Sequence, residues 1–219
     1  MINIAIDGPA GAGKSTIAKK VAKQLGYIYV DTGALYRATA LYMLNKGVDI
    51  ENVSEVDKAC EDLDIDLNYC DNIQSVILCG NDVTSLLRKE EVGNMASKVS
   101  AIKSVRGALL DIQRQIAAKN NVVMDGRDIG TTVLPDACPK IYLTASSSER
   151  AHRRYKELIE KGESANLDAI EKDIIERDNR DMNRSISPLK QASDAIYLDS
   201  SNMSIDEVCE AIIENVNRL

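Results

Sequence analysis

The sequence predicts an α/β protein built on a five-stranded parallel sheet with helices on both faces. Five short apolar segments alternate with longer segments in which apolar residues recur every three or four positions, as in helices that cover a parallel sheet. A glycine-rich stretch directly follows the first apolar segment, which is typical of a tight loop between a strand and a helix. The chain has 219 residues, enough for one such domain with an inserted subdomain.

The strands are short runs of Ile, Val, Leu and Tyr that stop at polar or turn-forming residues. The first run contains Ile4 and Ile6 and stops at Asp7, and the second stops at Asp31. The expected strands, in chain order, are 2–6, 27–30, 122–124, 141–143 and 196–198.

The helices are predicted from apolar stripes and from capping residues. Ile17, Val21 and Leu25, four apart, form the stripe of the first helix. Three helices open with the spacing of a capping box, Ser54 with Asp57, Ser146 with Glu149, and Ser204 with Glu207. The expected helices are 16–25, 34–45, 54–63, 89–99, 105–119, 147–161, 167–180 and 205–216.

The segment 65–82 interrupts this alternation. Residues 65–67 and 73–78 are β-rich, and Asp71-Asn72 between them is typical of a turn. We expect a small hairpin or meander that belongs to an insertion in the parallel sheet, and the pattern indicates no chemistry for it.

The glycine-rich stretch spells G-x-x-x-x-G-K-S, which is the P-loop spacing. Its glycines let successive backbone N–H groups face phosphate oxygens, and the following helix directs its positive end at them. Lys14 is expected to reach the β- and γ-phosphates, and Ser15 to hold Mg²⁺. The motif predicts a P-loop NTPase-type fold that binds a nucleoside triphosphate through Gly8, Pro9, Ala10, Gly11, Ala12, Gly13, Lys14, Ser15 and Thr16.

Composition narrows the possible functions. The net charge of −7 opposes binding to nucleic acid or to an anionic membrane. Five cysteines without C-x-x-C spacing predict reduced thiols rather than a disulfide framework or a zinc site. The sequence shows no signal-peptide pattern and no apolar stretch long enough to span a bilayer. We therefore expect a soluble, cytoplasmic protein, and nothing in the sequence requires more than a monomer.

Arginines follow the predicted strands. Arg37 comes after the second strand, Arg127 after the third, and Arg177, Arg180 and Arg184 lie near the end of a charged helix. Ligands of open α/β sheets bind at the carboxyl ends of the strands, and guanidinium groups hold phosphate with paired hydrogen bonds. These arginines indicate a phosphate-bearing ligand, although a surface ion pair is the alternative for each, above all for Arg180.

Five segments together resemble the bacterial cytidylate kinases, a group of nucleoside-monophosphate kinases, over essentially the full chain. They are 6–15, 31–37, 125–131, 149–154 and 176–184. The D-G-R-D-x-G-T and E-R-A-H-R-R sequences among them are far more specific than the P-loop alone. The resemblance implies Mg²⁺-assisted transfer of the γ-phosphoryl group of ATP to CMP or dCMP, which gives ADP and CDP or dCDP.

The resemblance also implies a domain layout and residue roles. The core would comprise 1–34 and 102–219, with an NMP-binding insertion over 35–101 and a mobile lid over about 150–184. Catalysis would rest on Lys14, Arg127, Arg177 and Arg184, with Arg150 and Arg154 of the lid on ATP and with Ser15 and Asp125 near Mg²⁺. CMP would be held by Thr32, Arg37, Ser97, Arg106, Asp128 and Asp181, of which Ser97, Arg106 and Asp128 would contact the cytosine. Thr32 stands where many relatives have Ser, and Ser15 where some have Thr or Gly.

Two other classes of protein share the P-loop. A kinase of the shikimate or gluconate type has the same sheet but no use for so long an insertion. A GTP-driven switch needs an N-K-x-D guanine motif late in the chain, whereas Asn45-Lys46-Gly47-Val48-Asp49 has the wrong spacing and lies too early. An acceptor-dependent release of ADP separates the kinases from the switch.

Overall fold

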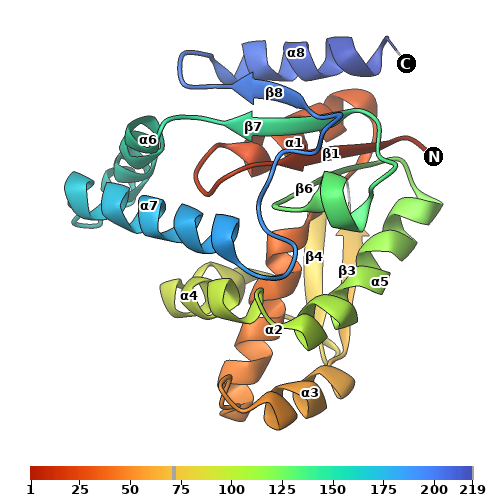
Figure 1. Cartoon of the computed structure of the whole chain (residues 1–219), viewed down its shortest axis with the longest axis vertical. Coiled ribbons are helices and arrows are strands. Elements are labelled where there is room, and N and C mark those ends of the chain that lie inside the picture. Colours follow the sequence, from red (N-terminus) through yellow and green to blue (C-terminus); the bar gives the residue numbers. More distant parts are fainter. Residues whose placement is uncertain (71–72, 219) are drawn as a thin grey trace.

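Five parallel strands form the central sheet of this computed structural model, which describes residues 1–70 and 73–218. The strand order is β2-β6-β1-β7-β8, as Figure 1 shows in part. The bounds are β1 Asn3–Asp7, β2 Ile28–Asp31, β6 Val122–Gly126, β7 Lys140–Thr144 and β8 Ile196–Asp199. Asp31 pairs with Asp125, and Asp7 pairs with Gly126. The carboxyl ends of these three strands therefore lie side by side. The predicted parallel sheet is confirmed.

Helices cover both faces of the sheet, because successive residues of each strand point to opposite sides. Ile4 and Ile6 of β1 belong to the apolar cluster that includes helices α1 (Lys14–Leu25) and α8 (Ile205–Val216). Ala5 belongs to the opposite cluster, which includes α2 (Thr32–Lys46) and α5 (Lys103–Lys119). Beyond the carboxyl end of β7, α6 (Ser147–Glu160) and α7 (Leu167–Asn183) pack against each other (Figure 1).

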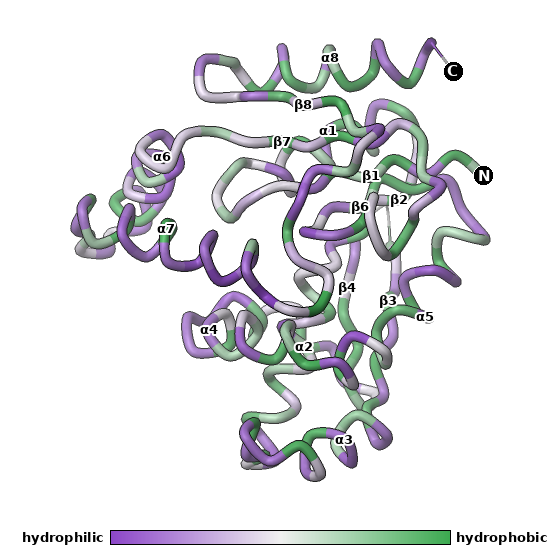
Figure 2. The backbone as a smooth tube through the Cα atoms, in the orientation of Figure 1, coloured by the Kyte–Doolittle hydropathy of each residue, from purple (hydrophilic) through white to green (hydrophobic). Residues whose placement is uncertain are grey.

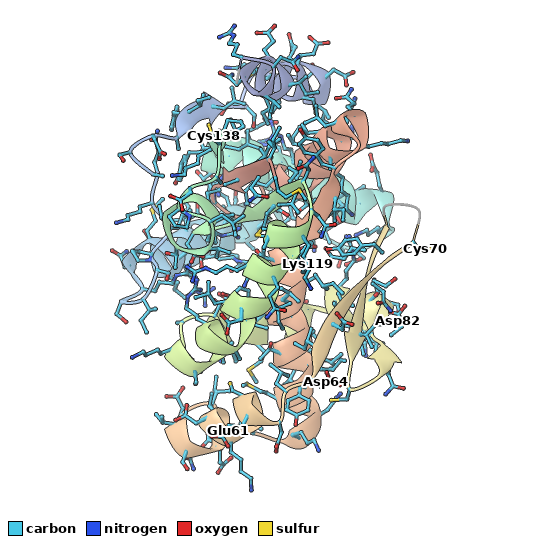
Figure 3. The ribbon with its side chains drawn as sticks, turned by 90° about the vertical axis from the view of Figure 1, so that its right-hand side faces the viewer. Glu61, Asp64, Cys70, Asp82, Lys119 and Cys138 are labelled. Atoms are coloured by element: carbon cyan, nitrogen blue, oxygen red, sulfur yellow. The ribbon has the colours of Figure 1, made fainter. Side chains whose placement is uncertain are left out.

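The insertion lies between β2 and β6 and contains a second, antiparallel sheet in the order β3-β4-β5. Its elements are α3 Val53–Glu61, β3 Ile65–Cys70, β4 Ile73–Leu78, β5 Asn81–Asp82, the 3₁₀ turn η1 Thr84–Arg88 and α4 Glu90–Val99. Figure 3 shows the hairpin that carries Cys70 above α3, which ends at Glu61. The β-rich prediction is confirmed, and the predicted turn at Asp71-Asn72 lies outside the described residues.

The insertion shares its hydrophobic core with the main sheet. Val76 and Leu78 of β4 belong to the same apolar cluster as Val30 of β2 and Met124 of β6. The cluster therefore runs without a break from one sheet to the other. The division into a core and an insertion over 35–101 stays a prediction.

Helix starts differ from the predictions where the capping residue differs. The expected cap Ser54 is wrong: Asn52 accepts the N–H of Glu55 at 3.4 Å, and its own amide donates to the Glu55 carboxylate at 2.9 Å. Asp31 caps α2 by accepting the N–H of Ala34 at 2.9 Å, so this helix starts at Thr32 rather than at residue 34. The capping box of Ser204 is confirmed.

The hydropathy of the elements matches their places in the fold. Figure 2 shows α7 as largely hydrophilic, in keeping with its few buried residues. Within the parts of the chain that the structure describes, no helix has the length and apolar character that crossing a membrane requires.

Candidate active site

The loop of residues 8–13 joins β1 to α1, and two of its glycines are required by geometry. A Cβ atom on Gly8 would lie 1.9 Å from the carbonyl oxygen of Leu143, so the close approach to β7 excludes any side chain. Gly13 precedes α1 at a φ of 83°, a conformation that favours glycine. The loop and the first turn of α1 line a cavity through residues 10–17.

Lys14 is a buried basic residue held by this loop. Its Nζ donates to the carbonyl oxygen of Pro9 at 2.7 Å, and the residue is only 5% exposed. Burial, followed by the nearby charge of Arg127, lowers the pKa of Lys14 to about 7. An anionic ligand in the cavity would favour the charged ammonium, because opposite charges attract strongly where water is excluded.

Asp125, near the end of β6, accepts hydrogen bonds from two hydroxyl groups. Its Oδ2 accepts the Ser15 hydroxyl at 3.0 Å, and its Oδ1 accepts the Tyr29 hydroxyl at 2.9 Å. Burial, followed by the nearby charge of Asp31, raises the pKa of Asp125 to about 6.

The oxygens of Ser15 and Asp125 fit the ligand preferences of Mg²⁺, a hard cation that binds oxygen. Among the described residues, no three His, Cys, Asp or Glu side chains gather as a metal cluster. A magnesium ion that arrives with nucleotide phosphates needs only one or two protein oxygens, and this pair can supply them.

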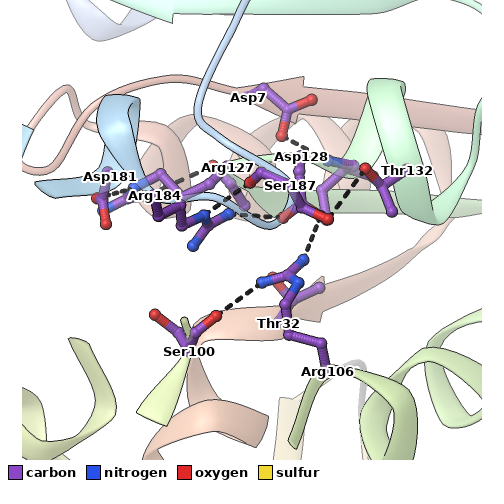
Figure 4. A network of polar contacts seen from close by, with 12 residues as sticks. Asp7, Thr32, Ser100, Arg106, Arg127, Asp128, Thr132, Asp181, Arg184 and Ser187 are labelled. Carbon is purple, nitrogen blue, oxygen red and sulfur yellow. Dashed lines mark hydrogen bonds and ion pairs between the residues drawn. The ribbon is translucent and has the colours of Figure 1, made fainter. Parts of the chain in front are cut away.

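Arginines with unsatisfied donors face the middle of the cavity. Arg127 donates from Nε to Asp181 at 2.8 Å (Figure 4). The Nε atoms of Arg37 and Arg177 are buried without a hydrogen-bond partner among the described residues. Burial, followed by the charge of Arg127, lowers the pKa of Arg177 to about 10. Unpartnered buried donors of this kind are costly unless a ligand accepts from them, so they indicate an anion site.

Asp128 forms a buried ionic centre with two arginines that line the same cavity. Arg184 donates to its Oδ1 at 3.3 Å, and Arg106 donates to its Oδ2 (Figure 4). Arg106 also donates to the carbonyl oxygen of Ser100 at 3.1 Å and lies over the ring of Tyr36, 5.5 Å from its centroid. The carboxylate is therefore held from two sides.

Asp7 fixes the turn that carries this centre. It accepts the backbone N–H groups of Ile129 at 2.8 Å and Gly130 at 2.7 Å, at the start of the turn η2 (Ile129–Val133). Burial raises the pKa of Asp7 to about 6, although these two hydrogen bonds lower it. The end of β1 thus positions the chain that follows β6.

One cavity of about 780 Å³ is lined by Lys14, Ser15, Asp125, Asp128 and the arginines described above, and this volume is within the usual range of ligand sites. Nine basic side chains line it, against six acidic ones, although the whole chain carries a net charge of −7. The basic residues are Lys14, Arg37, Arg106, Arg127, Arg150, Arg153, Arg154, Arg177 and Arg184, and the acidic ones are Asp31, Asp125, Asp128, Glu149, Glu157 and Asp181. The cavity is suited to polyanionic ligands.

Comparison with known proteins decides the family. A family model described as cytidylate kinase matches residues 4–218. The chain belongs to the cytidylate kinase family. The cytidylate kinase of Caldicellulosiruptor saccharolyticus is 49% identical over 213 residues, which are 97% of this chain and 94% of that protein. The cytidylate kinase of Exiguobacterium sibiricum is 48% identical, over 97% of this chain and 96% of its own length.

A solved structure supports the fold of this cytidylate kinase family member. A gluconokinase from Sinorhizobium meliloti 1021 matches with a TM-score of 0.51 and 13% identity, over 99% of this chain and 92% of the other. At that identity the likeness concerns the fold alone, which is the predicted α/β architecture.

The structure brings the predicted site residues of this family member together. All of them except Gly8 and Pro9 line the cavity, and these two belong to the loop behind it. Thr32 donates its hydroxyl to the carbonyl oxygen of Asp125 at 2.7 Å. Ser97 reaches the cavity from α4. Their roles toward the nucleotides stay predictions.

Arg150, which the resemblance places in a mobile lid, is buried and forms hydrogen bonds with three other segments of the chain. Its Nε donates to Ala145 at 2.8 Å, and its Nη1 donates to the carbonyl of Ala10 at 2.9 Å and to Asp178 at 2.7 Å. Only 5% of the residue is exposed. It links the P-loop, the end of β7 and α7. Arg154 is paired with Glu157 at 2.9 Å on the surface of α6.

Sequence analysis missed several residues of the site. Asp31 caps α2 and also accepts from Arg37 at 2.9 Å. Arg153 donates to the carbonyl oxygen of Ser200 at 2.8 Å and lines the cavity. Two signals were available: an Asp directly before a predicted helix is typical of a cap, and Arg153 lies three residues after Arg150, on the same helix face.

Proposed function

We propose that this protein is a cytidylate kinase that transfers the γ-phosphoryl group of ATP to CMP or dCMP, with Mg²⁺, and releases ADP and CDP or dCDP. The observation that carries the proposal is one cavity lined by the P-loop, by the buried Asp128 centre and by two arginines, Arg37 and Arg177, whose Nε atoms have no partner among the described residues. Such a cavity suits two nucleotides placed with their phosphates toward each other. The family of the chain supports the same conclusion and favours it over a kinase of the shikimate or gluconate type and over a GTP-driven switch.

The reaction depends on alignment and charge rather than on a general base. The attacking oxygen of the acceptor phosphate is already ionised at neutral pH. Arg37, Arg127 and Arg177 would hold the acceptor phosphate in line with the γ-phosphate, and Lys14 would exchange the Pro9 carbonyl for a phosphate oxygen. Preorganised cations stabilise the charge on the transferring group without reorganising during the step.

Mg²⁺ would be held by Ser15 and Asp125 beside the nucleotide phosphates. When bound, the ion neutralises charge on the β- and γ-phosphate oxygens. Asp125 and Lys14 are both buried, and the charge of Lys14 opposes the rise in the pKa of Asp125.

Asp128 would select the acceptor base. Cytosine presents an exocyclic amino donor where uracil presents a carbonyl oxygen, and a carboxylate can only accept hydrogen bonds. Arg106 and Arg184 hold this carboxylate in place. Ser97 would complete the contacts to the base, while Asp181 would accept from the ribose hydroxyls.

The test is a panel of acceptors. ADP release is measured with purified protein, ATP and CMP, dCMP, UMP, AMP, GMP or shikimate, with and without Mg²⁺. We expect turnover with CMP and dCMP, far less with the other acceptors, and none without the metal. Absence of CDP from CMP would refute the proposal, and slow GTP hydrolysis that no acceptor changes would support a switch instead.

A further inference from the structure

One residue of the inserted sheet forms hydrogen bonds with the outer strand of the main sheet. β2 is an outer strand of the five-stranded sheet, so one side of its backbone has no neighbouring strand. Gln74 of β4 reaches this side: its Oε1 accepts the N–H of Asp31 at 2.9 Å, and its Nε2 donates to the carbonyl oxygen of Asp31 at 3.4 Å. One side-chain amide thus serves both backbone groups that a neighbouring strand would pair.

Asp31 connects this contact to the cavity, because Asp31 is one of the residues that line it. Its Oδ2 accepts from Nη2 of Arg37 at 2.9 Å, and its Oδ1 caps α2 through the N–H of Ala34. A Cβ on Gly33 would lie 3.0 Å from Nη1 of Arg37 and 3.1 Å from the Asp31 carboxylate, so this pair is closely packed over the glycine. Arg37 itself lines the cavity with its Nε unpartnered among the described residues.

We propose that Gln74 is a positioning residue for the acceptor phosphate. The inserted sheet fixes the backbone of Asp31, the carboxylate of Asp31 fixes Arg37, and Arg37 meets the phosphate of the acceptor. The inference rests on the proposed function and gives the β3–β5 sheet a part in it. Guanidinium–phosphate pairing depends on orientation, so a small shift at Asp31 weakens binding of the phosphate.

The chemistry of the contact requires a glutamine. An amide carries a donor and an acceptor at once, which matches the N–H and C=O of one backbone residue. A glutamate at this position would lose the donor and would place a further negative charge beside Asp31, whose charge already raises the pKa of Asp125. An alanine would leave both backbone groups of Asp31 without their partner.

The experiment compares Gln74→Ala and Gln74→Glu with Asn68→Ala. Asn68 lies on the neighbouring strand β3, is exposed, and makes no side-chain hydrogen bond to the described residues. We expect both Gln74 variants to raise the KM for CMP about tenfold, which corresponds to one or two neutral hydrogen bonds. The KM for ATP should change by less than about threefold, because the P-loop does not depend on this contact. Asn68→Ala should match the wild type.

Two further measurements separate positioning from general loosening of the fold. In calorimetric titrations, CMP should bind the Gln74 variants more weakly while cytidine, which lacks the phosphate, binds as before. In an Arg37→Ala background, Gln74→Ala should add no further increase in the KM for CMP. Melting curves show that each variant is folded.

The inference is overturned by an unchanged KM for CMP, by equal losses for CMP and cytidine, or by additive effects of the Arg37 and Gln74 substitutions. An inactive wild type would instead overturn the proposed function, and the inference with it. Active wild type together with an indifferent Gln74→Ala would overturn the inference alone.

Discussion

Single side chains in this cavity hold one another in place before any ligand arrives. Asp128 is only 4% exposed and is contacted by Arg106 of α5 and by Arg184, which follows α7. Arg127 contacts Asp181 in the same way. Because each carboxylate is held by guanidinium groups from distant segments, replacing one residue changes both an orientation and a charge.

The first prediction concerns the choice of base. In Asp128→Asn, the side chain keeps its shape but gains an amide donor that can serve the carbonyl of uracil. We expect the ratio of kcat/KM for CMP to that for UMP to fall by ~10², since unmatched polar contacts are a main source of discrimination. Steady-state assays with both acceptors measure it. Asp194→Asn, a carboxylate 61% exposed and paired with Lys140 away from the cavity, is the control. An unchanged ratio in folded Asp128→Asn would remove the proposed role.

The second prediction concerns phosphoryl transfer. In Arg127→Ala, we expect kcat to fall by ~10³ or more, as when an arginine that stabilises the transition state is removed. Thermal stability should change little, because Arg177 and Arg184 still lower the pKa of Asp181, the ion-pair partner. Single-turnover kinetics and melting curves measure the two effects. Arg180→Ala, an exposed arginine of α7, serves as the control, and near-normal turnover in Arg127→Ala would refute the assignment.

At the scale of elements, patterns in the sequence predicted the strands and helices, which depend on residues close together in the chain. The five strands and most helices follow from runs and stripes that reflect burial, so their order and type were predictable. The two-residue strand β5 is too short to leave a pattern. The contact of Gln74 with Asp31 joins residues 43 apart, and that of Arg150 with Ala10 joins residues 140 apart. Such contacts depend on how the elements pack together, so the hydrogen bonds of Arg150 with the P-loop and with α7 could not be predicted.

The start of α3 gives a prediction at this scale. In Asn52→Ala, we expect the free energy of unfolding to fall by about 1 kcal/mol, because the N–H of Glu55 loses its cap. In Ser54→Ala, we expect a change of less than about 0.5 kcal/mol, since this residue lies exposed inside the first turn. Urea denaturation of both variants measures the difference. Equal losses, or a larger loss in Ser54→Ala, would contradict the observed cap.

At the scale of the whole molecule, a chain with a net charge of −7 encloses a cavity rich in cations. The fold achieves this by bringing cations from the P-loop, α2, the segment after β6, α5, α6, α7 and the residue that follows α7 to one cavity. Repulsion among these cations and their burial act against folding in the absence of ligand. Stability should therefore depend on pH through the most deeply buried of them.

Lys14 provides the test. Its pKa is about 7 in the folded protein against an ordinary value of 10.5, so between these values the unfolded chain binds more protons and the free energy of unfolding rises with pH. Below about pH 7 both states hold the proton, and this contribution is flat. We expect the difference in unfolding free energy between wild type and Lys14→Met to rise from pH 7 to pH 9.5, on the order of 1 kcal/mol per pH unit.

Urea titrations across this range measure the difference, and bound ATP should reduce the rise because phosphate favours the charged ammonium. A difference that stays level, or that falls as the pH increases, would contradict the lowered pKa.

The contact between Lys14 and the carbonyl of Pro9 has a consequence for every reaction cycle. A lysine in open solvent must shed its hydration shell each time it meets a nucleotide. Here the side chain of Lys14 loses its hydration shell once, when the chain folds, because burial places it against the carbonyl oxygen of Pro9. When the nucleotide binds, the ammonium exchanges the Pro9 carbonyl oxygen for a phosphate oxygen. The free-energy cost of removing water from the ammonium is met during folding and not at each binding event.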